Sequence, residues 1–202
     1  MSVGAAYYPV DPLTSPGKWC ESGARKTLLH AMTNTDVRIA RAGSTSLRLG
    51  KMEIDFIGTR EEDFMDSPNS TSIINLVRYG DNSFLFTGDQ AAVGEPVHLA
   101  HMLEDAKAFG FSSLKVDMVK RPHHGNCNPG EDFWKATDPG LIVVPNNGKS
   151  GAVDSASKRN VRQNAPNAQL LKLSSHDSIT LVSDGSRIEV FYDVEPSRWK
   201  RN

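Results

Sequence analysis

Two stretches of the sequence place residues suited to metal or acid–base chemistry directly after apolar segments. His123 and His124 follow the segment Leu114–Val119, and Asp89 follows the segment Ser83–Thr87. Zinc accepts both imidazole nitrogen and carboxylate oxygen as ligands, and both groups also transfer protons in enzymes. The two stretches therefore indicate a metal site or an acid–base site, with a purely structural role for each side chain as the alternative.

The local sequence predicts that these side chains lie at strand ends. Pro122 should end the pairing of the first segment because proline has no N–H to donate, and Gly125 permits a sharp turn after His124. Strand ends hold side chains at the rim of a sheet, where sites are commonly built. The structural alternatives are a surface pair of histidines and, for Asp89, a cap on a helix that begins near Ala91.

The rest of the chain is predicted to contain further strands, helices and turns. The predicted strands are Ala5–Val10, Val37–Ala42, Ser46–Leu49, Met52–Ile57, Ser72–Tyr79, Leu141–Val144, Gln169–Leu173, Ile179–Ser183 and Arg187–Tyr192. The predicted helices are Glu21–Met32, Glu95–Phe109, Asp132–Ala136 and Ser155–Asn164. Turn residues at 80–82 and 184–185 predict antiparallel hairpins across these positions.

Size and charge bound the class of protein. The 202 residues suffice for one domain with a sizeable core, and 23 Lys and Arg nearly balance 24 Asp and Glu, for a net charge of −1. This balance gives no overall electrostatic preference for nucleic acid or an anionic membrane, although it is compatible with a local basic groove. We therefore expect one domain over residues 1–202, with a polar tail from about residue 195.

Cysteine usage and hydropathy bear on location. Cys20 and Cys127 lie far apart and do not form a disulfide framework. No apolar run approaches the ~20 residues of a membrane helix, and the first residues do not have the pattern of a signal peptide. We therefore expect a cytoplasmic protein with no membrane partner.

The order of these motifs resembles the metallo-β-lactamase fold superfamily, and within it the branch containing the soluble domain of the ComEC-type DNA-uptake proteins. The stretches that carry the resemblance are Asn69–Ile74, Phe84–Asp89 and Val116–Gly125. The order of strand, Gly-Asp, helix, strand, His-His-Gly, helix, buried strand and closing hairpin also matches. The resemblance covers roughly Val37 to Tyr192.

The resemblance implies an αββα sandwich and a metal-dependent hydrolase that uses zinc or manganese. It implies an activity like that of a nuclease or phosphodiesterase, on a phosphodiester or another small hydrolysable substrate. In that superfamily the aspartate of Gly-Asp bridges two metal ions and the later histidine binds one. Asp89 would then be the bridging ligand, His124 the terminal ligand and His123 a catalytic residue beside the metals. Which of the two histidines is the ligand stays open at this point.

Three other groups are weaker candidates for chemistry. Cys127 lies close after His124, where a thiolate would be a ligand for a soft metal, and His98 and His101 share one face of a predicted helix. For each of these a packing or surface role is the alternative. The dipeptide 176–177 is most simply a turn.

The sequence departs from the superfamily because it lacks the main ligand run, His-x-His-x-Asp-His. The first matching elements belong to the middle of the fold, so we expect the chain to correspond to the C-terminal half to two-thirds of the domain. A catalytic zinc ion takes about three protein ligands, whereas Asp89 and His124 supply two. We therefore expect weak metal binding and little or no hydrolysis by this chain alone.

Three hypotheses follow. In the first, the chain is a hydrolase whose N-terminal half is truncated, split off or frameshifted. In the second, it is an inactive descendant that is retained as a binding or partner module. The third is an unrelated α/β protein in which Asp89 caps a helix. Absence of the first strands would leave an apolar sheet surface or an unpaired edge exposed. We therefore expect a homo-oligomer, or a partner that carries the other half.

Overall fold

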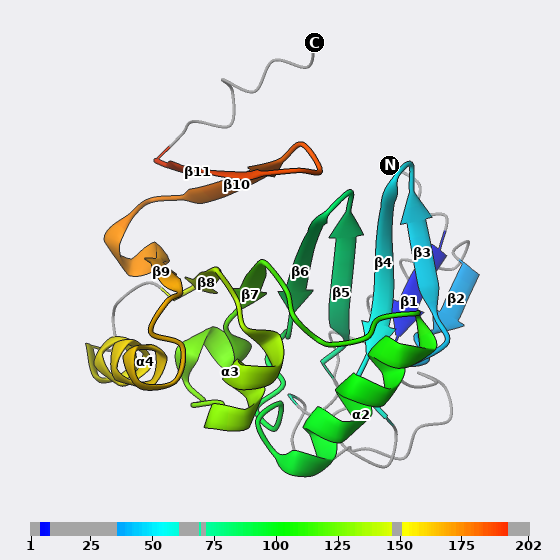
Figure 1. The fold of residues 1–202 in the computed structure, drawn as a ribbon, viewed down its shortest axis with the longest axis horizontal. Coiled ribbons are helices and arrows are strands. Elements are labelled where there is room, and N and C mark those ends of the chain that lie inside the picture. The colour runs from blue at the N-terminus through cyan, green and yellow to red at the C-terminus, as the bar shows by residue number, and fades with distance from the viewer. Residues whose placement is uncertain (1–4, 9–35, 61–68, 70–71, 147–150, 194–202) are drawn as a thin grey trace.

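The structure is a computed structural model that describes residues 5–8, 36–60, 69, 72–146 and 151–193. Its main feature is a mixed seven-stranded sheet with helices on one face (Figure 1). The α/β class expected from the sequence is confirmed. The predicted helix Glu21–Met32 and the polar tail from residue 195 lie outside the described residues.

The strands of this sheet follow the chain order from one edge to the other. They are β3 (Ser46–Leu49), β4 (Met52–Ile57), β5 (Ile74–Tyr79), β6 (Asn82–Phe86), β7 (Met118–Lys120), β8 (Leu141–Val144) and β9 (Gln169–Lys172). Neighbouring strands from β3 to β6 are antiparallel, and those from β6 to β9 are parallel. The change of pattern falls at β6, the strand that leads to Asp89.

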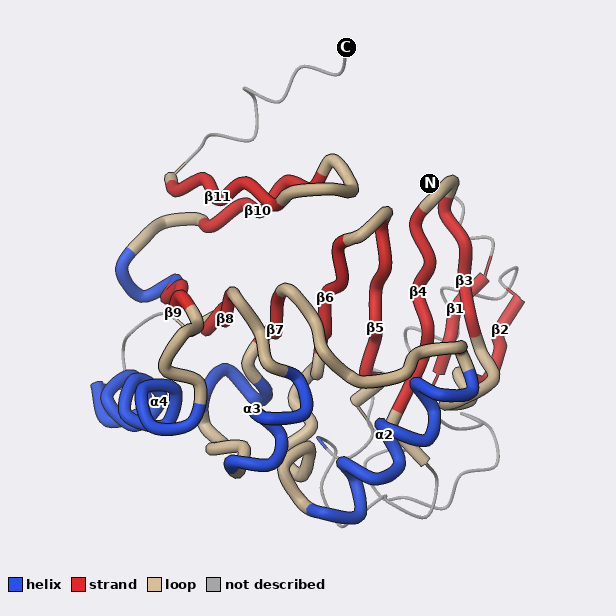
Figure 2. Tube along the Cα trace, in the orientation of Figure 1, coloured by secondary structure: helices blue, strands red, loops and turns tan. Residues whose placement is uncertain are grey.

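Helices form the connections between the parallel strands, and they lie on the same face of the sheet (Figure 2). They are α2 (Pro96–Ala108), α3 (Glu131–Thr137) and α4 (Gly151–Asn164). Right-handed connections that all advance in one direction across a sheet place their helices on one side of it. In the part of the chain that the structure describes, no helix is long and apolar enough to cross a membrane.

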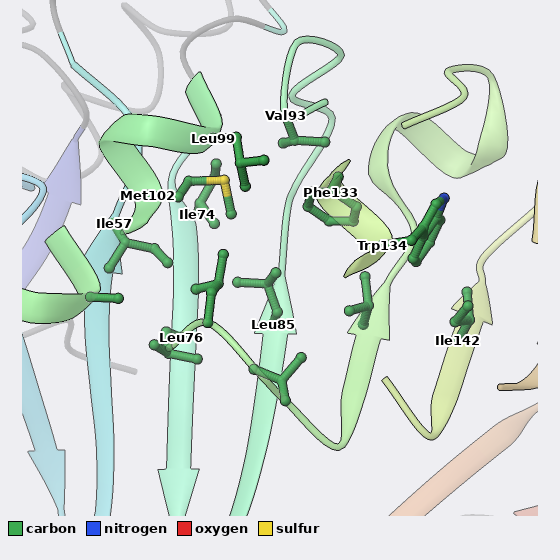
Figure 3. Close-up of a cluster of buried hydrophobic side chains, with 14 of the residues drawn as sticks. Ile57, Ile74, Leu76, Leu85, Val93, Leu99, Met102, Phe133, Trp134 and Ile142 are labelled. Carbon is green, nitrogen blue, oxygen red and sulfur yellow. The ribbon is translucent and has the colours of Figure 1, made fainter. Parts of the chain in front are cut away.

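The hydrophobic core lies between these helices and the sheet (Figure 3). The core residues labelled there are Ile57, Ile74, Leu76, Leu85, Val93, Leu99, Met102, Phe133, Trp134 and Ile142. The indole N–H of Trp134 donates to Asn160 Oδ1 at 3.0 Å, so the polar end of this buried ring is satisfied. The core therefore fixes α2 and α3 against the strands that precede the candidate site.

The predicted strand Leu114–Val119 is longer than the observed one, because only Met118–Lys120 pairs as β7. Val116 is buried, but its N–H bonds to a carbonyl at the end of α3 and not to a strand. The carboxylate of Asp117 accepts the backbone N–H of Ser83 at 2.7 Å. The apolar residues before β7 therefore reflect burial in the core and not sheet pairing.

Two smaller sheets flank the main one. β1 (Ala5–Tyr8) pairs in parallel with β2 (Asp36–Ile39). β10 (Ile179–Ser183) and β11 (Ile188–Tyr192) form the antiparallel hairpin expected from the turn at 184–185. The hairpin lies over the sheet face opposite the helices (Figure 1). At its tip, Gly185 O accepts the N–H of Asp81 at 2.6 Å.

The face beneath this hairpin is apolar and, among the described residues, only partly covered. A hollow of about 680 Å³ separates the hairpin from the sheet. It is lined by Met52, Ile54, Val77, Tyr79, Phe84, Phe86, Met118, Lys120, Val143, Leu181 and Ser183. Phe86 is 39% exposed there. Within the described part of the chain, this sheet face is therefore apolar and only partly covered.

Two neighbouring carboxylates on α2, those of Glu104 and Asp105, bind the segment that follows β4. The guanidinium of Arg60 contacts Glu104 at 2.8 Å and Asp105 at 3.1 Å, but Asp105 also accepts the buried N–H of Gly58 at 2.7 Å. Asp105→Ala should lower the free energy of unfolding by about 2–3 kcal/mol, since it leaves that N–H unsatisfied.

Glu104→Ala is the matched control, because Glu104 shares Arg60 but its side chain is 70% exposed. It should cost less than about 1 kcal/mol. Urea denaturation of both variants measures the difference, and equal costs would contradict the role assigned to Asp105.

Candidate metal centre

Three parallel strands bring the candidate residues to one edge of the sheet. Parallel neighbours end at the same edge, and open α/β sheets bind their ligands there. Asp89 follows β6, His123 and His124 follow β7, and Pro145 follows β8. Because β5 is antiparallel to β6, the segment just before β5, with Ser72, lies at this edge as well.

The turn that presents Asp89 requires a glycine. Gly88 has φ +56°, a backbone conformation that favours glycine, and a Cβ at this position would lie 2.7 Å from Ser72 Cβ. The hydroxyl oxygen of Ser72 accepts the N–H of Asp89 at 3.0 Å. The Gly-Asp turn is therefore held by a hydrogen bond and close packing from Ser72, in the segment that leads into β5.

The turn that presents the histidines has an unfavourable backbone conformation. His123 and His124 have φ values of 46° and 53°, in the left-handed region, which costs roughly 1–2 kcal/mol per non-glycine residue. Gly125 follows with φ +87°, and Ser157 Oγ of α4 donates to its carbonyl at 3.2 Å. Such conformations persist only where the surroundings enforce them, and they are commonly found at functional sites.

The carboxylate of Asp89 and the imidazole of His124 meet at this edge. Asp89 Oδ2 lies 3.2 Å from His124 Nε2, and His124 Nδ1 lies 2.9 Å from Pro145 O. A carbonyl only accepts, so Nδ1 carries a proton and donates it. In the neutral imidazole, the lone pair of Nε2 then faces the carboxylate, and two acceptors at this distance need a proton or a metal ion between them.

The separation of the two atoms suits a metal. Donors placed about 2.0–2.2 Å from a tetrahedral zinc ion lie roughly 3.3–3.5 Å apart, close to the 3.2 Å observed between Asp89 Oδ2 and His124 Nε2. The pair therefore fits two ligand positions. Among the described residues, however, no group of three or more His, Cys, Asp or Glu side chains is placed to hold a metal ion.

Lys120 is a member of the site that the sequence did not indicate. Its ammonium lies 3.4 Å from Asp89 Oδ1, donates to Gly88 O, and its side chain is only 18% exposed. One oxygen of Asp89 thus faces Lys120 and the other faces His124. The ammonium supplies part of the positive charge that a metal ion would otherwise bring to this carboxylate.

Arg121 is the second residue that the sequence did not indicate. Its side chain is fully buried, and it donates to Cys127 O at 3.0 Å, Asn128 Oδ1 at 2.6 Å and Asn160 Oδ1 at 3.3 Å. Burial lowers its pKa to about 10, so the guanidinium is still charged at neutral pH. Arg121 therefore joins the loop after the histidine turn to α4.

The two histidines have different surroundings. The ring of His123 lies 6.5 Å from that of His124, centroid to centroid, and its Nε2 is 3.4 Å from Asn69 Nδ2. The N–H of His123 donates to Gly88 O at 3.3 Å. The structure thus places His124, and not His123, beside Asp89.

The weaker candidates lie apart from this pair or are engaged elsewhere. The thiol of Cys127 donates to Pro122 O at 3.5 Å, and burial raises its pKa, which disfavours the thiolate that binds metals. His98 is buried on α2. His176 lies in a bend at 176–177, as the sequence predicts, and its Nδ1 pairs with Asp193 Oδ2 at 3.1 Å.

The alternative in which Asp89 caps a helix beginning near Ala91 is wrong. Residues 91–94 form turns, and α2 begins at Pro96 with Glu95 as its N-terminal cap residue. The carboxylate of Asp89 is directed at His124 and Lys120 instead.

The left-handed turn gives a test by substitution. His124→Gly should be more stable than His124→Ala by roughly 0.5–1 kcal/mol, since only glycine adopts φ near +53° without a steric cost. The neighbouring Asn126 has φ −71°, so there the order should reverse and alanine should be the more stable substitution.

Thermal or urea unfolding of these four variants measures both differences. If alanine were favoured over glycine at both positions, the left-handed conformation of His124 would be contradicted.

Comparison with known proteins adds no assignment. No protein-family model matches the sequence. No curated protein matches it either.

Proposed function

We propose that this chain supplies part of a metallo-hydrolase site, in which Asp89 and His124 bind a divalent ion such as zinc or manganese. The observation that carries the proposal is the approach of Asp89 Oδ2 to His124 Nε2 at 3.2 Å while Pro145 O accepts a hydrogen bond from His124 Nδ1–H. These two atoms belong to the turns that follow two different strands, and their lone pairs converge on a position that a proton or a metal ion would fill.

The resemblance to the metallo-β-lactamase superfamily supports this proposal and suggests a phosphodiester as the bond that is cleaved. The motifs follow the same order along the chain, and the resemblance implies the same pair of ligands. In the complete fold that we propose, the hairpin of β10 and β11 belongs to the second sheet of an αββα sandwich. Its position over the open face of the main sheet is consistent with this.

When bound, a divalent ion in such a site lowers the pKa of water so that hydroxide forms near neutral pH. The chain's own residues would hold this arrangement in place. Ser72 fixes the turn of Asp89, and Pro145 fixes the tautomer of His124. His123, whose Nε2 accepts from Asn69, would carry its proton on Nδ1 and donate it to a substrate oxygen.

The proposed site needs ligands that the described residues do not supply. We propose that they come from a strand-bearing partner segment that provides imidazole ligands and pairs with the hairpin of β10 and β11. Among the described strands, this hairpin pairs with no other, and an isolated two-stranded hairpin is marginally stable in water. Such a segment would also cover the apolar face of the main sheet, which a homo-oligomer would cover without adding these ligands.

A catalytically inactive binding module is the second candidate. Lys120 favours it, because its ammonium already lies 3.4 Å from Asp89 Oδ1. A site in which the lysine ammonium replaces the metal ion would keep the positions of its side chains but would not activate water for hydrolysis. The two candidates differ in one measurable property, the affinity for a divalent ion.

Zinc titration with a competing chelator tests the proposal. The wild-type chain should bind zinc weakly, and Asp89→Asn or His124→Gln should lower the affinity by about tenfold or more, which corresponds to roughly 1.4 kcal/mol. His176→Gln is the matched control, because His176 also pairs with a carboxylate, at 3.1 Å.

Lys120→Met should raise the zinc affinity if the ammonium competes with the metal for Asp89. Binding that is the same in all of these variants, or no zinc binding in either the wild type or Lys120→Met, would favour the inactive module.

Light scattering coupled to size exclusion tests whether the open face needs a cover. The isolated chain should self-associate, and Phe86→Lys should reduce this because Phe86 lines the hollow. Val97→Lys, at a residue that is 60% exposed on α2, should not reduce it. A stable monomer that unfolds cooperatively would contradict the need for a partner.

A further inference from the structure

The exposed side of α4 carries a cluster of positive charge. Lys158, Arg159 and Arg162 are all exposed, and with Ser155 and Gln163 they line an open hollow of about 420 Å³. None of the three cations forms an ion pair with an acidic side chain among the described residues. We call these five residues the basic flank.

The arrangement of charge along the helix is unfavourable for an isolated protein. Lys158 and Arg162 are four residues apart, and Arg159 and Arg162 are three apart, so they are neighbours on the helix surface and repel each other. The chain as a whole has a net charge of −1, so this cluster is a local feature and not part of a general basic character. A cluster of basic side chains that has no acidic partner among the described residues is the electrostatic footprint of a polyanion site.

The opposite side of the same helix packs against the turn that carries the two histidines. Ser157 is buried and donates to Gly125 O at 3.2 Å, next to His124. Asn160 accepts from Arg121 and donates to Pro129 O at 3.1 Å. A ligand held on the outer side of α4 would therefore be held at a fixed position relative to the histidine turn.

The helix also relates the basic flank to the edge of the sheet. α4 connects β8 to β9 along the main sheet (Figure 1), and β8 ends beside Pro145, whose carbonyl holds His124. From Ser155 to Gln163 the flank extends over about 12 Å at 1.5 Å per residue. That length suits a few consecutive backbone phosphates.

We propose that the basic flank binds the phosphodiester backbone of a nucleic-acid strand and leads that strand towards the edge that carries Asp89 and His124. Guanidinium groups match phosphate oxygens in geometry and charge. The described lining of the flank contains no large apolar side chain that would enter a lipid bilayer, which disfavours an anionic membrane as the partner.

The contacts of such a flank are to the backbone, so binding is independent of base sequence. The link to hydrolysis rests on the proposed function, because it makes a polymeric phosphodiester the substrate. Binding itself does not depend on a metal, and this separates the two proposals in the test.

Fluorescence anisotropy of a labelled single-stranded oligonucleotide, in EDTA at low salt, tests the flank. The variant is Lys158→Gln/Arg159→Gln/Arg162→Gln. The matched control is Arg41→Gln/Lys51→Gln/Lys107→Gln, which removes the same charge from exposed positions away from α4. Far-UV circular dichroism and a thermal melt check the fold of both variants, and Arg162→Gln alone should have an intermediate effect.

The flank variant should bind at least about tenfold more weakly than the wild type at low salt, while the control changes little. The slope of log K against log salt should become shallower by about 2, since each lost phosphate contact on a single strand contributes about 0.7. The wild type should bind the oligonucleotide in EDTA even if the hydrolase proposal fails, because binding to the flank does not involve a metal.

Equal weakening of both triple variants would overturn the proposal, because net charge alone would explain it. No oligonucleotide binding by the wild type, or unchanged binding by the flank variant, would overturn it as well. So would a flank variant that loses binding to phosphatidylserine vesicles while its oligonucleotide binding is unchanged.

Discussion

The parallel register of β6, β7 and β8 is the constraint on which the candidate site depends. Phe86 lies opposite Lys120, and Lys120 lies opposite Val143. Asp89 follows β6, His124 follows β7, and Pro145 directly follows β8, so the three strand ends deliver a carboxylate, an imidazole and a carbonyl to one place. A slip of one residue in this register would turn Lys120 to the opposite face and separate the other groups.

Residues on the helix side of the sheet stabilise the turn that carries the two histidines. Arg121 is buried without a described carboxylate partner and is satisfied mainly by a carbonyl and by amide oxygens. Ser157 holds Gly125, and both histidines keep a left-handed backbone. Burying a charge and holding two strained residues both cost stability. These costs fall on Arg121 and on the turn Pro122–Gly125 that follows it, which supports the proposal that this turn is functional.

Local features of the fold were predictable because they depend on neighbouring residues. The Gly-Asp turn needs a glycine at position 88, and the hairpin at 184–185 follows from its turn residues. Residue patterns also predicted α2, which spans Pro96–Ala108 where Glu95–Phe109 was expected. The start of α4 was less accurate, since the helix begins at Gly151 and not at Ser155.

The parts that could not be predicted depend on contacts between distant segments. Lys120 reaches Asp89 only because β6 and β7 pair in this register, and Arg121 finds its partners on a loop and on α4. The segment from Leu114 has the apolar pattern of a strand, yet it packs into the core without pairing as one. The choice between His123 and His124 as neighbour of Asp89 also depended on the turn's conformation, which no local pattern specified.

Anomalous X-ray scattering at the zinc edge, from crystals of this chain grown with zinc, would test the central claim most directly. The account predicts a peak about 2.0–2.2 Å from both Asp89 Oδ2 and His124 Nε2, in place of the direct contact between them. It also predicts that Lys120 moves away from Asp89 to admit the ion. A fully occupied peak at His176 and Asp193 with none at Asp89 and His124 would contradict the account.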